Sequence, residues 1–465
     1  MTDPQDEPQE DPEDGPQDRR LAVIVPLVLA LLVGGGAGAY ALGWLGRPNP
    51  TPQTSMQTQQ TPKPQPLHIA EVKPGDTTAP ATHLKGKPDK DAIEQRMQKA
   101  LGDKRLKGHI HAVIAPLDGD PVYENNPSPA TPASTTKLLT TAAALDVYGA
   151  EHRFTTSVDR QGSTITLVGG GDPLLQDGGL GRLAIDTATA LGATRTVHLA
   201  YDDFLFTGPP VDPHWRTTYL GSEVGHITAL SVNGAKTSVG GYSTDPSGDA
   251  VRAFAKHLAK HGIKVVGKPV HAHRQGTQIA SYAGITLRQI VEYDLQRSDN
   301  QIAETLAHQI GLHAGDPSFT GSVKAEIEQL KDMHVDTDGL TLYDGSGLTR
   351  NDKMPPTVLV SVLQKAANPD HPKLGPVLSG LPVAGWVGGL ARRFMLDATP
   401  GRGYVRAKVG TLTQVSAYAG IVNDRRGTPI IAVMMEDGFK PDTVLDVRDA
   451  LDDAMTALAT CTCST

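Results

Sequence analysis

The stretch PASTTKLLTTAAAL, residues 132–145, places a serine and a lysine three residues apart at the start of an apolar, alanine-rich segment. The spacing of the apolar residues predicts a helix, with Ser134 at its N-cap and Lys137 one turn later on the same side. A lysine kept neutral in a dry pocket can take the proton of a serine hydroxyl, which makes the serine a nucleophile for acyl transfer. The alternative is a capping serine followed by a solvated lysine, and the rest of the chain must decide between the two.

The tripeptide Ser298-Asp299-Asn300 joins two helical patterns, a place from which side chains can enter a cleft. In an acyl-transfer site Ser298 would relay a proton to the leaving amine. Asn300 would hold an amide of the substrate. The motif therefore fits the chemistry suggested by Ser134.

A third tripeptide, Lys408-Val409-Gly410, lies in a β-patterned run before Thr411. Lys408 would supply positive potential, and Gly410 would let the substrate backbone lie close against an edge strand. The backbone N–H of Ser134, at a helix N-terminus, would form half of an oxyanion hole. The order Ser-x-x-Lys, Ser-x-Asn, Lys-x-Gly makes the three motifs together much more informative than any one alone.

The segment SVNGAKTS, residues 231–238, shows how weak a single motif is. It contains a second Ser-x-Asn pair, Ser231 and Asn233, and a second lysine–threonine pair, Lys236 and Thr237. Neither pair is followed by a helical or edge-strand pattern. We therefore interpret both as chance matches without a catalytic role.

The elements expected around the three motifs are a mixture of helices and strands. The patterns predict a helix at 91–101, a strand–turn–strand unit at 109–126, helices within 285–311, and a final series of strand, strand and helix at 404–422, 428–437 and 445–459. Residues 155–280 differ, with short strands, glycine turns and a single helix at 249–263. We interpret 155–280 as a β-rich inserted domain that divides the main domain into 90–154 and 281–460.

The N-terminal region predicts an anchored, exported protein. Residues 1–20 form an acidic tail that ends in Arg19 and Arg20, and the uncharged run at 21–45 is long enough to span a bilayer. Residues 46–89 are a linker rich in Pro, Thr and Gln. The alternative for 21–45 is a cleaved secretory signal, and both interpretations place the following residues outside the cytoplasm.

Composition excludes some other functions. The formal net charge is -8 and most of it lies in residues 1–20, so no basic face is available for nucleic acid. The two cysteines, Cys461 and Cys463, lie in a tail that we expect to be disordered, with a disulfide within the tail as the alternative. No metal-binding motif stands out among the histidines, so we expect neither a metal nor a cofactor.

These motifs, with five longer stretches, resemble the penicillin-binding serine D-alanyl-D-alanine carboxypeptidase/endopeptidase family (low-molecular-mass class C, peptidase family S13). The stretches are LVGGGDPLL, DDFLFTGPP, ITALSVNG, YDGSGLTR and LPVAGWVGGLARRF, and the resemblance covers roughly residues 90–460. It implies an α+β fold: a β-lactamase/transpeptidase-like domain, in which helices flank an antiparallel sheet, with an insertion between the first two motifs.

The resemblance also assigns roles to the site residues. It implies Ser134 as nucleophile, Lys137 as base and Ser298 as a further catalytic residue. Asn300, Lys408, Gly410 and Thr411 would bind the substrate, with the N–H groups of Ser134 and Thr411 forming the oxyanion hole.

Two positions depart from the family pattern. Val409 replaces the threonine of the usual Lys-Thr-Gly, whose hydroxyl helps to bind the substrate's terminal carboxylate, and Gly389 stands where related chains have threonine. We therefore expect weakened carboxylate recognition, although Thr411 keeps one hydroxyl within reach.

The function that we expect is a serine D-Ala-D-Ala carboxypeptidase acting on peptidoglycan stem peptides, with endopeptidase activity on cross-links as an extension. β-Lactams would inhibit it by acylating Ser134. A β-lactamase is disfavoured because no Glu-x-x-Leu-Asn follows the second motif. The alternative function, suggested by Val409, is a catalytically degraded homologue that binds wall peptide or a protein partner.

Overall fold

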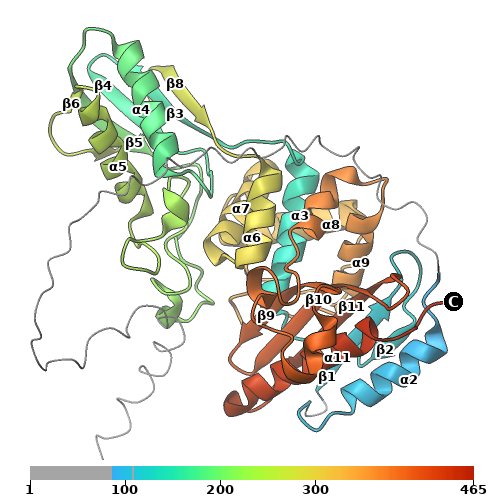
Figure 1. Ribbon diagram of the computed structural model, residues 1–465. Helices are drawn as coiled ribbons and strands as arrows, with labels where there is room; N and C mark the ends of the chain where they lie inside the picture. Colours follow the sequence, from blue (N-terminus) through green and yellow to red (C-terminus); the bar gives the residue numbers. More distant parts are fainter. Residues whose placement is uncertain (1–85, 107–108) are drawn as a thin grey trace, which may run out of the picture. The chain divides into compact units, whose positions relative to one another are not determined.

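The computed structural model describes residues 86–106 and 109–465 (Figure 1). Its first sheet has five strands in the order β2-β1-β11-β10-β9, and every neighbouring pair is antiparallel. The strands are β1 (Ile110–Ala115), β2 (Tyr123–Asn125), β9 (Val405–Leu412), β10 (Val415–Asn423) and β11 (Pro429–Asp437). Strand β9, which carries the third motif, therefore lies at an edge of this sheet.

Both faces of the first sheet are buried, and strand β1 shows how. Successive side chains of a strand point to opposite faces. Ile110, Ala112 and Ile114 belong to the apolar core on one face, whereas Val113 and Ala115 belong to the core on the other. All six residues of β1 are buried, so the sheet is the middle layer of three.

The helices divide between these two faces. The first core contains residues of α2 (Lys90–Leu101) and α11 (Val444–Ala459). The second contains residues of α3 (Lys137–Tyr148), α6 (Leu287–Arg297), α7 (Asn300–Ala314), α8 (Phe319–Asp332), α9 (Pro356–Ala367) and the short α10 (Gly375–Ser379). The three helices that position the site, α3, α6 and α7, thus pack on the same face of the sheet.

The second sheet is formed within the insertion, in the order β6-β5-β4-β3-β8 with β7 beside β5. Its strands are β3 (Thr155–Gln161), β4 (Thr164–Val168), β5 (Thr196–Asp202), β6 (Lys264–Val265), β7 (Val270–His271) and β8 (Thr277–Ala283). Helices α4 (Asp177–Leu191) and α5 (Pro246–Lys260) pack against it and share one apolar core with β3, β4 and β5. This core is separate from the two cores of the first sheet.

The insertion contains one more long helix than the sequence indicated, because α4 was missed. Strands β4 and β5 are parallel, and a parallel pair needs a long crossover connection, usually a helix. Helix α4 is that crossover. In its sequence, DGGLGRLAIDTATAL, two glycines and one threonine occupy exposed or half-exposed positions opposite the apolar face. These residues have a low helix propensity, so the helical pattern was not recognised.

Residues 203–245 of the insertion are mostly irregular and pack against the rest of the molecule. Trp215, Val224 and Ile227 form an apolar cluster with Phe319 of α8 and with Leu348. This segment therefore connects the inserted sheet to the helices around the site.

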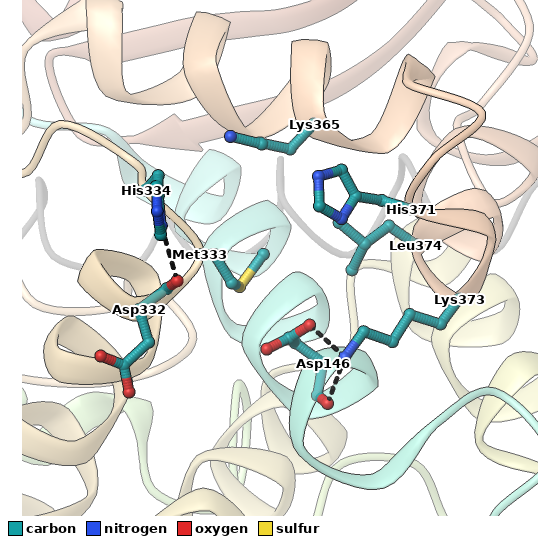
Figure 2. Close-up of a pocket in the computed structure, with 8 residues that line it drawn as sticks. All are labelled: Asp146, Asp332, Met333, His334, Lys365, His371, Lys373 and Leu374. Atoms are coloured by element: carbon teal, nitrogen blue, oxygen red, sulfur yellow. Dashed lines mark hydrogen bonds and ion pairs between the residues drawn. The ribbon is translucent and has the colours of Figure 1, made fainter.

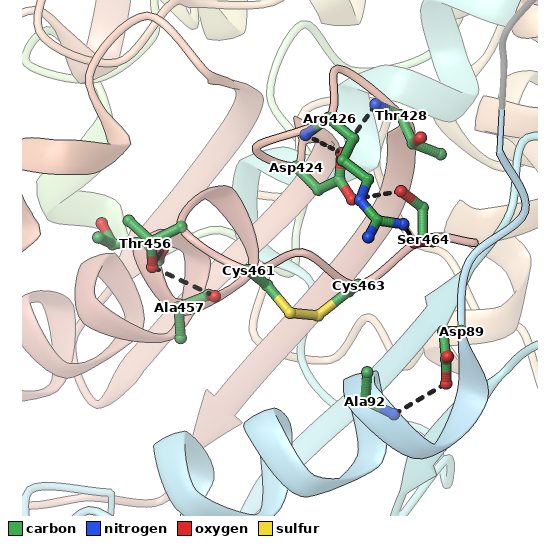
Figure 3. Close-up of a disulfide and its surroundings, with 11 residues drawn as sticks. Asp89, Ala92, Asp424, Arg426, Thr428, Thr456, Ala457, Cys461, Cys463 and Ser464 are labelled. Atoms are coloured by element: carbon green, nitrogen blue, oxygen red, sulfur yellow. Dashed lines mark hydrogen bonds between the residues drawn. A yellow bond between two sulfur atoms is a disulfide. The ribbon is translucent and has the colours of Figure 1, made fainter.

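The C-terminal tail is ordered, so the expectation of a disordered end was wrong. Cys461 and Cys463 form a disulfide and are buried in the core beside α2 and α11 (Figure 3). The Asp89 N–H donates to Cys463 O at 2.7 Å, and the Thr465 N–H donates to Lys87 O at 3.0 Å. The tail is held by residues distant in sequence, a contact that its composition could not reveal.

Among residues 86–106 and 109–465, no helix is long and apolar enough to cross a membrane. The apolar run at 21–45 and the linker up to residue 85 lie outside these described residues.

Candidate active site

Ser134 lies in a short 3-10 helix, η1 (Ala133–Thr136), which leads directly into α3. The N-cap residue of α3 is Thr136, whose side chain makes no capping hydrogen bond. Ser134 is therefore not the N-cap that the sequence predicted, because the extra turn moves the start of α3 to Lys137. The Ser134 hydroxyl instead accepts a hydrogen bond from Lys137 Nζ at 3.1 Å.

The residue before this serine has a strained backbone. Ala133 has a φ of 47°, a left-handed conformation that costs roughly 1 kcal/mol for a residue with a Cβ atom. Gly347 lies against this turn so closely that a Cβ there would be 2.0 Å from Ala133 O. Strained backbone conformations of this kind are found mainly at functional sites, where the surrounding structure holds them in place.

Lys137 is completely buried and has three polar partners. Besides Ser134 Oγ, its Nζ donates to Asn300 Oδ1 and to Ser346 O, each at 2.7 Å. Helix α3 thus brings Lys137 to the point where the first and second motifs meet.

Ser298 and Asn300 lie on either side of the junction between α6 and α7. Ser298 is the C-cap of α6, with a left-handed φ of 56°, and its N–H donates to Asp294 O at 2.6 Å. Asp299 is the N-cap of α7, and its side chain accepts the Gln301 N–H. This turn directs Asn300 towards Lys137 and leaves the Ser298 hydroxyl bound to Lys408.

Strand β9 supplies Lys408, Gly410 and Thr411. Lys408 is buried, and its Nζ donates to Ser298 Oγ at 2.8 Å and to Val409 O at 2.7 Å. A Cβ on Gly410 would lie 2.8 Å from Ser134 N, so only glycine allows β9 to approach η1 this closely. Thr411 is exposed and follows directly.

The site therefore contains two serine–lysine pairs, and burial acts on both amines. Burial lowers the pKa of Lys137, although the negative charges of Asp294, Asp344 and Glu304 oppose the shift. Burial also lowers the pKa of Lys408 well below its ordinary value, and the positive charge of Lys137 adds to this effect. An amine with a lowered pKa can accept a proton near neutral pH, as a general base must.

A sequence profile of the D-Ala-D-Ala carboxypeptidase 3 (S13) family matches residues 93–225 and 221–458. The chain belongs to this family. The matched regions contain all three motifs, and family membership makes the protein a serine peptidase, a hydrolase.

Relatives of similar length support this family. Carboxypeptidase DacB of Mycolicibacterium smegmatis is 31% identical over 417 residues, which cover 84% of this chain and 88% of that protein. A D-alanyl-D-alanine carboxypeptidase of Actinomadura sp. is 27% identical over 453 residues, covering 77% of this chain and 83% of that protein. The crystal structure of penicillin-binding protein 4 from Haemophilus influenzae covers 77% of this chain and 99% of its own, with a TM-score of 0.64 at 21% identity, and so shares its α+β fold.

The two departures from the family pattern are neighbours in space. Val409 is half-buried and packs against the core beside α11, on the face of β9 opposite to Lys408. A Cβ on Gly389 would lie 3.1 Å from Val409 Cγ2. The missing side chain at 389 therefore leaves room for the methyl groups of Val409.

Sequence analysis missed two buried carboxylates around Lys137. Asp294 Oδ1 accepts the Asp299 N–H at 3.1 Å, and Glu304 Oε1 accepts the Ser346 N–H at 2.8 Å. Burial raises the pKa of Asp294 to about 7, against the lowering effect of Lys137. The signal was available, because Asp294 continues the buried series of Leu287, Ile290 and Val291 along α6.

The structure also has a pocket of about 430 Å³ that shares no residue with this site (Figure 2). It is lined by Asp146, Asp332, Met333, His334, Lys365, His371, Lys373 and Leu374. Lys373 spans part of it and donates to Asp146 O at 2.9 Å. Neither a predicted catalytic residue nor a predicted substrate-binding residue reaches this pocket.

A buried carboxyl group behind the site predicts a pH effect on stability. Glu326 of α8 is fully buried, accepts a hydrogen bond from Thr140 Oγ1, and has its pKa raised by burial from 4.5 to about 8. Between these values the folded state keeps a proton that the unfolded chain releases, so the free energy of unfolding falls as the pH rises. The Glu326→Gln variant stays neutral and should gain stability relative to the wild type from about pH 5 to about pH 8.

Thermal unfolding across this pH range measures the effect. Glu328→Gln is the matched control, because Glu328 lies on the same helix with an exposed side chain. A difference between wild type and Glu326→Gln that does not change with pH would contradict the prediction.

Proposed function

We propose that this protein is a serine-type D-Ala-D-Ala carboxypeptidase that acts on peptidoglycan stem peptides through an acyl-serine intermediate. The observation that carries the proposal is the pair of buried lysines, each hydrogen-bonded to a serine of the site. Family membership and the carboxypeptidases among the relatives give the substrate class. The same chemistry on a cross-linked peptide would be endopeptidase activity.

The hydrogen bonds of Lys137 suggest how Ser134 becomes a nucleophile. Asn300 Oδ1 and Ser346 O can only accept, so they take the two hydrogens of a neutral amine. With Lys137 neutral, the third position on Nζ is a lone pair 3.1 Å from Ser134 Oγ, so this hydrogen bond reverses its direction and the amine can accept the hydroxyl proton. Lys137 is thus proposed as the general base of acylation.

The proposed reaction has two steps. Ser134 Oγ attacks the carbonyl carbon between the two D-alanines, and its proton passes to Lys137. The C–N bond then breaks as Ser298 relays the proton from Lys137 to the leaving amine of the terminal D-alanine, so that Lys137 returns to its neutral form, Ser298 keeps its hydroxyl, and Lys408 holds that hydroxyl in place. Water next cleaves the Ser134 ester, which releases the shortened peptide and restores the hydroxyl.

The remaining residues are proposed to bind substrate. The N–H groups of Ser134 and Thr411 would hold the oxyanion, because Gly410 brings β9 close to Ser134 N. Asn300 would hold a substrate amide. A terminal carboxylate bound beside Lys408 would favour the charged form of this buried amine and would pair with it. β-Lactams would acylate the same serine; a structure of the Haemophilus influenzae protein is a complex with such a compound.

We further propose that the catalytic domain consists of residues 90–154 and 281–460, with 155–280 as the inserted domain. The separate sheets and separate apolar cores support this division. We also propose that residues 21–45 anchor the protein in the cell membrane, with the catalytic domain outside. The uncharged run and the preceding Arg19 and Arg20 support this topology.

Covalent capture tests the nucleophile. The full-length protein treated with a β-lactam should gain one acyl group on the peptide that contains Ser134, and Ser134→Ala should gain none. Mass spectrometry of the digested protein locates the adduct. An adduct on another residue, or none at high drug concentration, would exclude the acyl-serine mechanism.

Restoring the missing hydroxyl tests carboxylate recognition. Val409→Thr is nearly isosteric and keeps the β-branch, so it should disturb β9 little. If the hydroxyl at position 409 reaches the terminal carboxylate from the edge of β9, a new hydrogen bond of about 1.5–3 kcal/mol should raise kcat/KM on a D-Ala-D-Ala peptide roughly ten- to a hundredfold. If it stays against the core beside α11, where Val409 packs, kcat/KM should not change. Acylation by an ester that lacks this carboxylate should barely change.

The peptidase rates of the wild type and of Val409→Thr together distinguish an active enzyme from a catalytically degraded homologue. No detectable peptidase activity in either form would favour the binding-only alternative. A measurable wild-type rate that Val409→Thr leaves unchanged would show that Thr411 and Lys408 suffice for the carboxylate.

Protease protection tests the topology. Protease added to intact protoplasts should remove the domain that follows residue 45 and leave a small protected N-terminal fragment. A tag fused to the N-terminus allows this fragment to be detected and its size to be measured. Full protection of the chain would refute an external catalytic domain.

A further inference from the structure

A small hairpin in the insertion, residues 235–243, presents two side chains to the active site. Lys236 and Tyr242 pair across it as an antiparallel bridge. The Ser243 N–H donates to Ala235 O at 2.7 Å, and the Thr237 N–H donates to Gly241 O at 3.1 Å. This 235–243 hairpin contains the lysine–threonine pair to which the sequence analysis gave no role.

Both side chains of the hairpin contact Asp299, the middle residue of the second motif. Lys236 Nζ lies 2.5 Å from Asp299 Oδ2, and the Tyr242 hydroxyl donates to Asp299 Oδ1 at 3.2 Å. Lys236 Nζ also lies 5.8 Å from the ring centroids of Tyr242 and of Tyr293 on α6. Two residues of the insertion therefore hold one carboxylate of the site.

The charge of Lys236 matters because Asp299 is almost inaccessible. The Asp299 side chain is 1% exposed, whereas that of Lys236 is 42% exposed. A buried carboxylate without a paired charge is costly, and removal of its partner leaves the charge uncompensated. Asp294 of α6, which accepts the Asp299 N–H at 3.1 Å, is itself an acid and supplies no opposite charge.

Asp299 in turn fixes its two neighbours. Its Oδ1 accepts the Gln301 N–H at 3.2 Å, which caps α7 at the residue after Asn300. The insertion contacts the same turn at further points: Asn300 Nδ2 donates to Glu223 O at 3.0 Å, and Gln301 Oε1 accepts the Gly225 N–H at 2.9 Å. Movement of Asp299 would therefore shift Ser298 and Asn300 away from the two lysines.

We propose that Lys236 is a positioning residue for catalysis: its ion pair with Asp299 holds Ser298 and Asn300 in contact with Lys408 and Lys137. Lys236 itself touches neither the substrate nor the reacting atoms. The inserted domain thus takes part in the geometry of the catalytic turn. This inference rests on the proposed acyl-serine function for its kinetic test.

The kinetic test compares acylation of the full-length protein by a fluorescent penicillin. Lys236→Met should lower the second-order acylation rate constant about ten- to a hundredfold, because a displacement of about 1 Å at a catalytic group costs on the order of a hundredfold. Lys236→Arg, which keeps the charge, should recover most of the rate. Lys268→Met, at an exposed lysine of the same insertion, should match the wild type.

A double-variant comparison shows whether the effect passes through Asp299. If it does, Asp299→Asn combined with Lys236→Met should acylate no more slowly than Lys236→Met alone. Tyr242→Phe is the milder second variant, should Lys236→Met fail to fold, and is expected to slow acylation several-fold. Wild-type rates in both Lys236→Met and Tyr242→Phe, or losses that add to that of Asp299→Asn, would overturn the proposal.

Hydrogen exchange gives a readout that does not depend on activity. Amide exchange measured by mass spectrometry should speed up in the peptide covering 298–305 of Lys236→Met, but not in Lys268→Met. If the wild type were not acylated at all, the proposed function would fail while this measurement still decided the role of Lys236. Unchanged exchange in this peptide would refute the positioning role.

Discussion

The buried amine of Lys137 is the constraint on which the rest of the site depends. An amine removed from water must find hydrogen-bond partners within the protein, or it is strongly destabilising. The fold supplies them from three separate elements: Ser134 in η1, Asn300 at the start of α7 and the carbonyl of Ser346. Because the second motif provides a partner for the buried amine of each of the other two motifs, the site exists only when the sheet, α3 and the α6–α7 turn are packed together.

The same logic explains the close contact between β9 and the turn that carries Ser134. Lys408 reaches Ser298 only if β9 lies against η1, and a side chain on Gly410 would collide with the backbone of Ser134. Behind the two amines lie the buried carboxyl groups of Asp294 and Glu304, whose pKa values burial raises while it lowers those of the amines. The site is therefore a compact network of buried polar side chains. Because solvent is excluded, their hydrogen bonds to one another hold them in fixed positions.

Much of this arrangement could be predicted from sequence because it is local or periodic. The helix expected at 91–101 is α2, and residues spaced as helix faces are buried in α3, whereas a turn at 413–414 divides the single strand expected at 404–422 into β9 and β10. Contacts between distant segments could not be predicted in this way. The ion pair of Lys236 with Asp299 joins residues 63 positions apart, and the ordered tail depends on residues 87–89. Asp294 was within reach, since a charged residue on an apolar helix face is visible in the sequence, but its partner lysines were not.

The ordered tail joins both ends of the described domain on one side of the first sheet. Residues 87–89 enter the domain beside residues 463–465, and the two strands of chain share hydrogen bonds next to α2 and α11. Ser134 belongs to the opposite side of the first sheet, where α3 packs. The hydrogen bonds that join residues 87–89 to the tail therefore lie on the face of the first sheet opposite to α3, so a change in the tail, such as loss of the disulfide, acts on Ser134 only through the sheet between them.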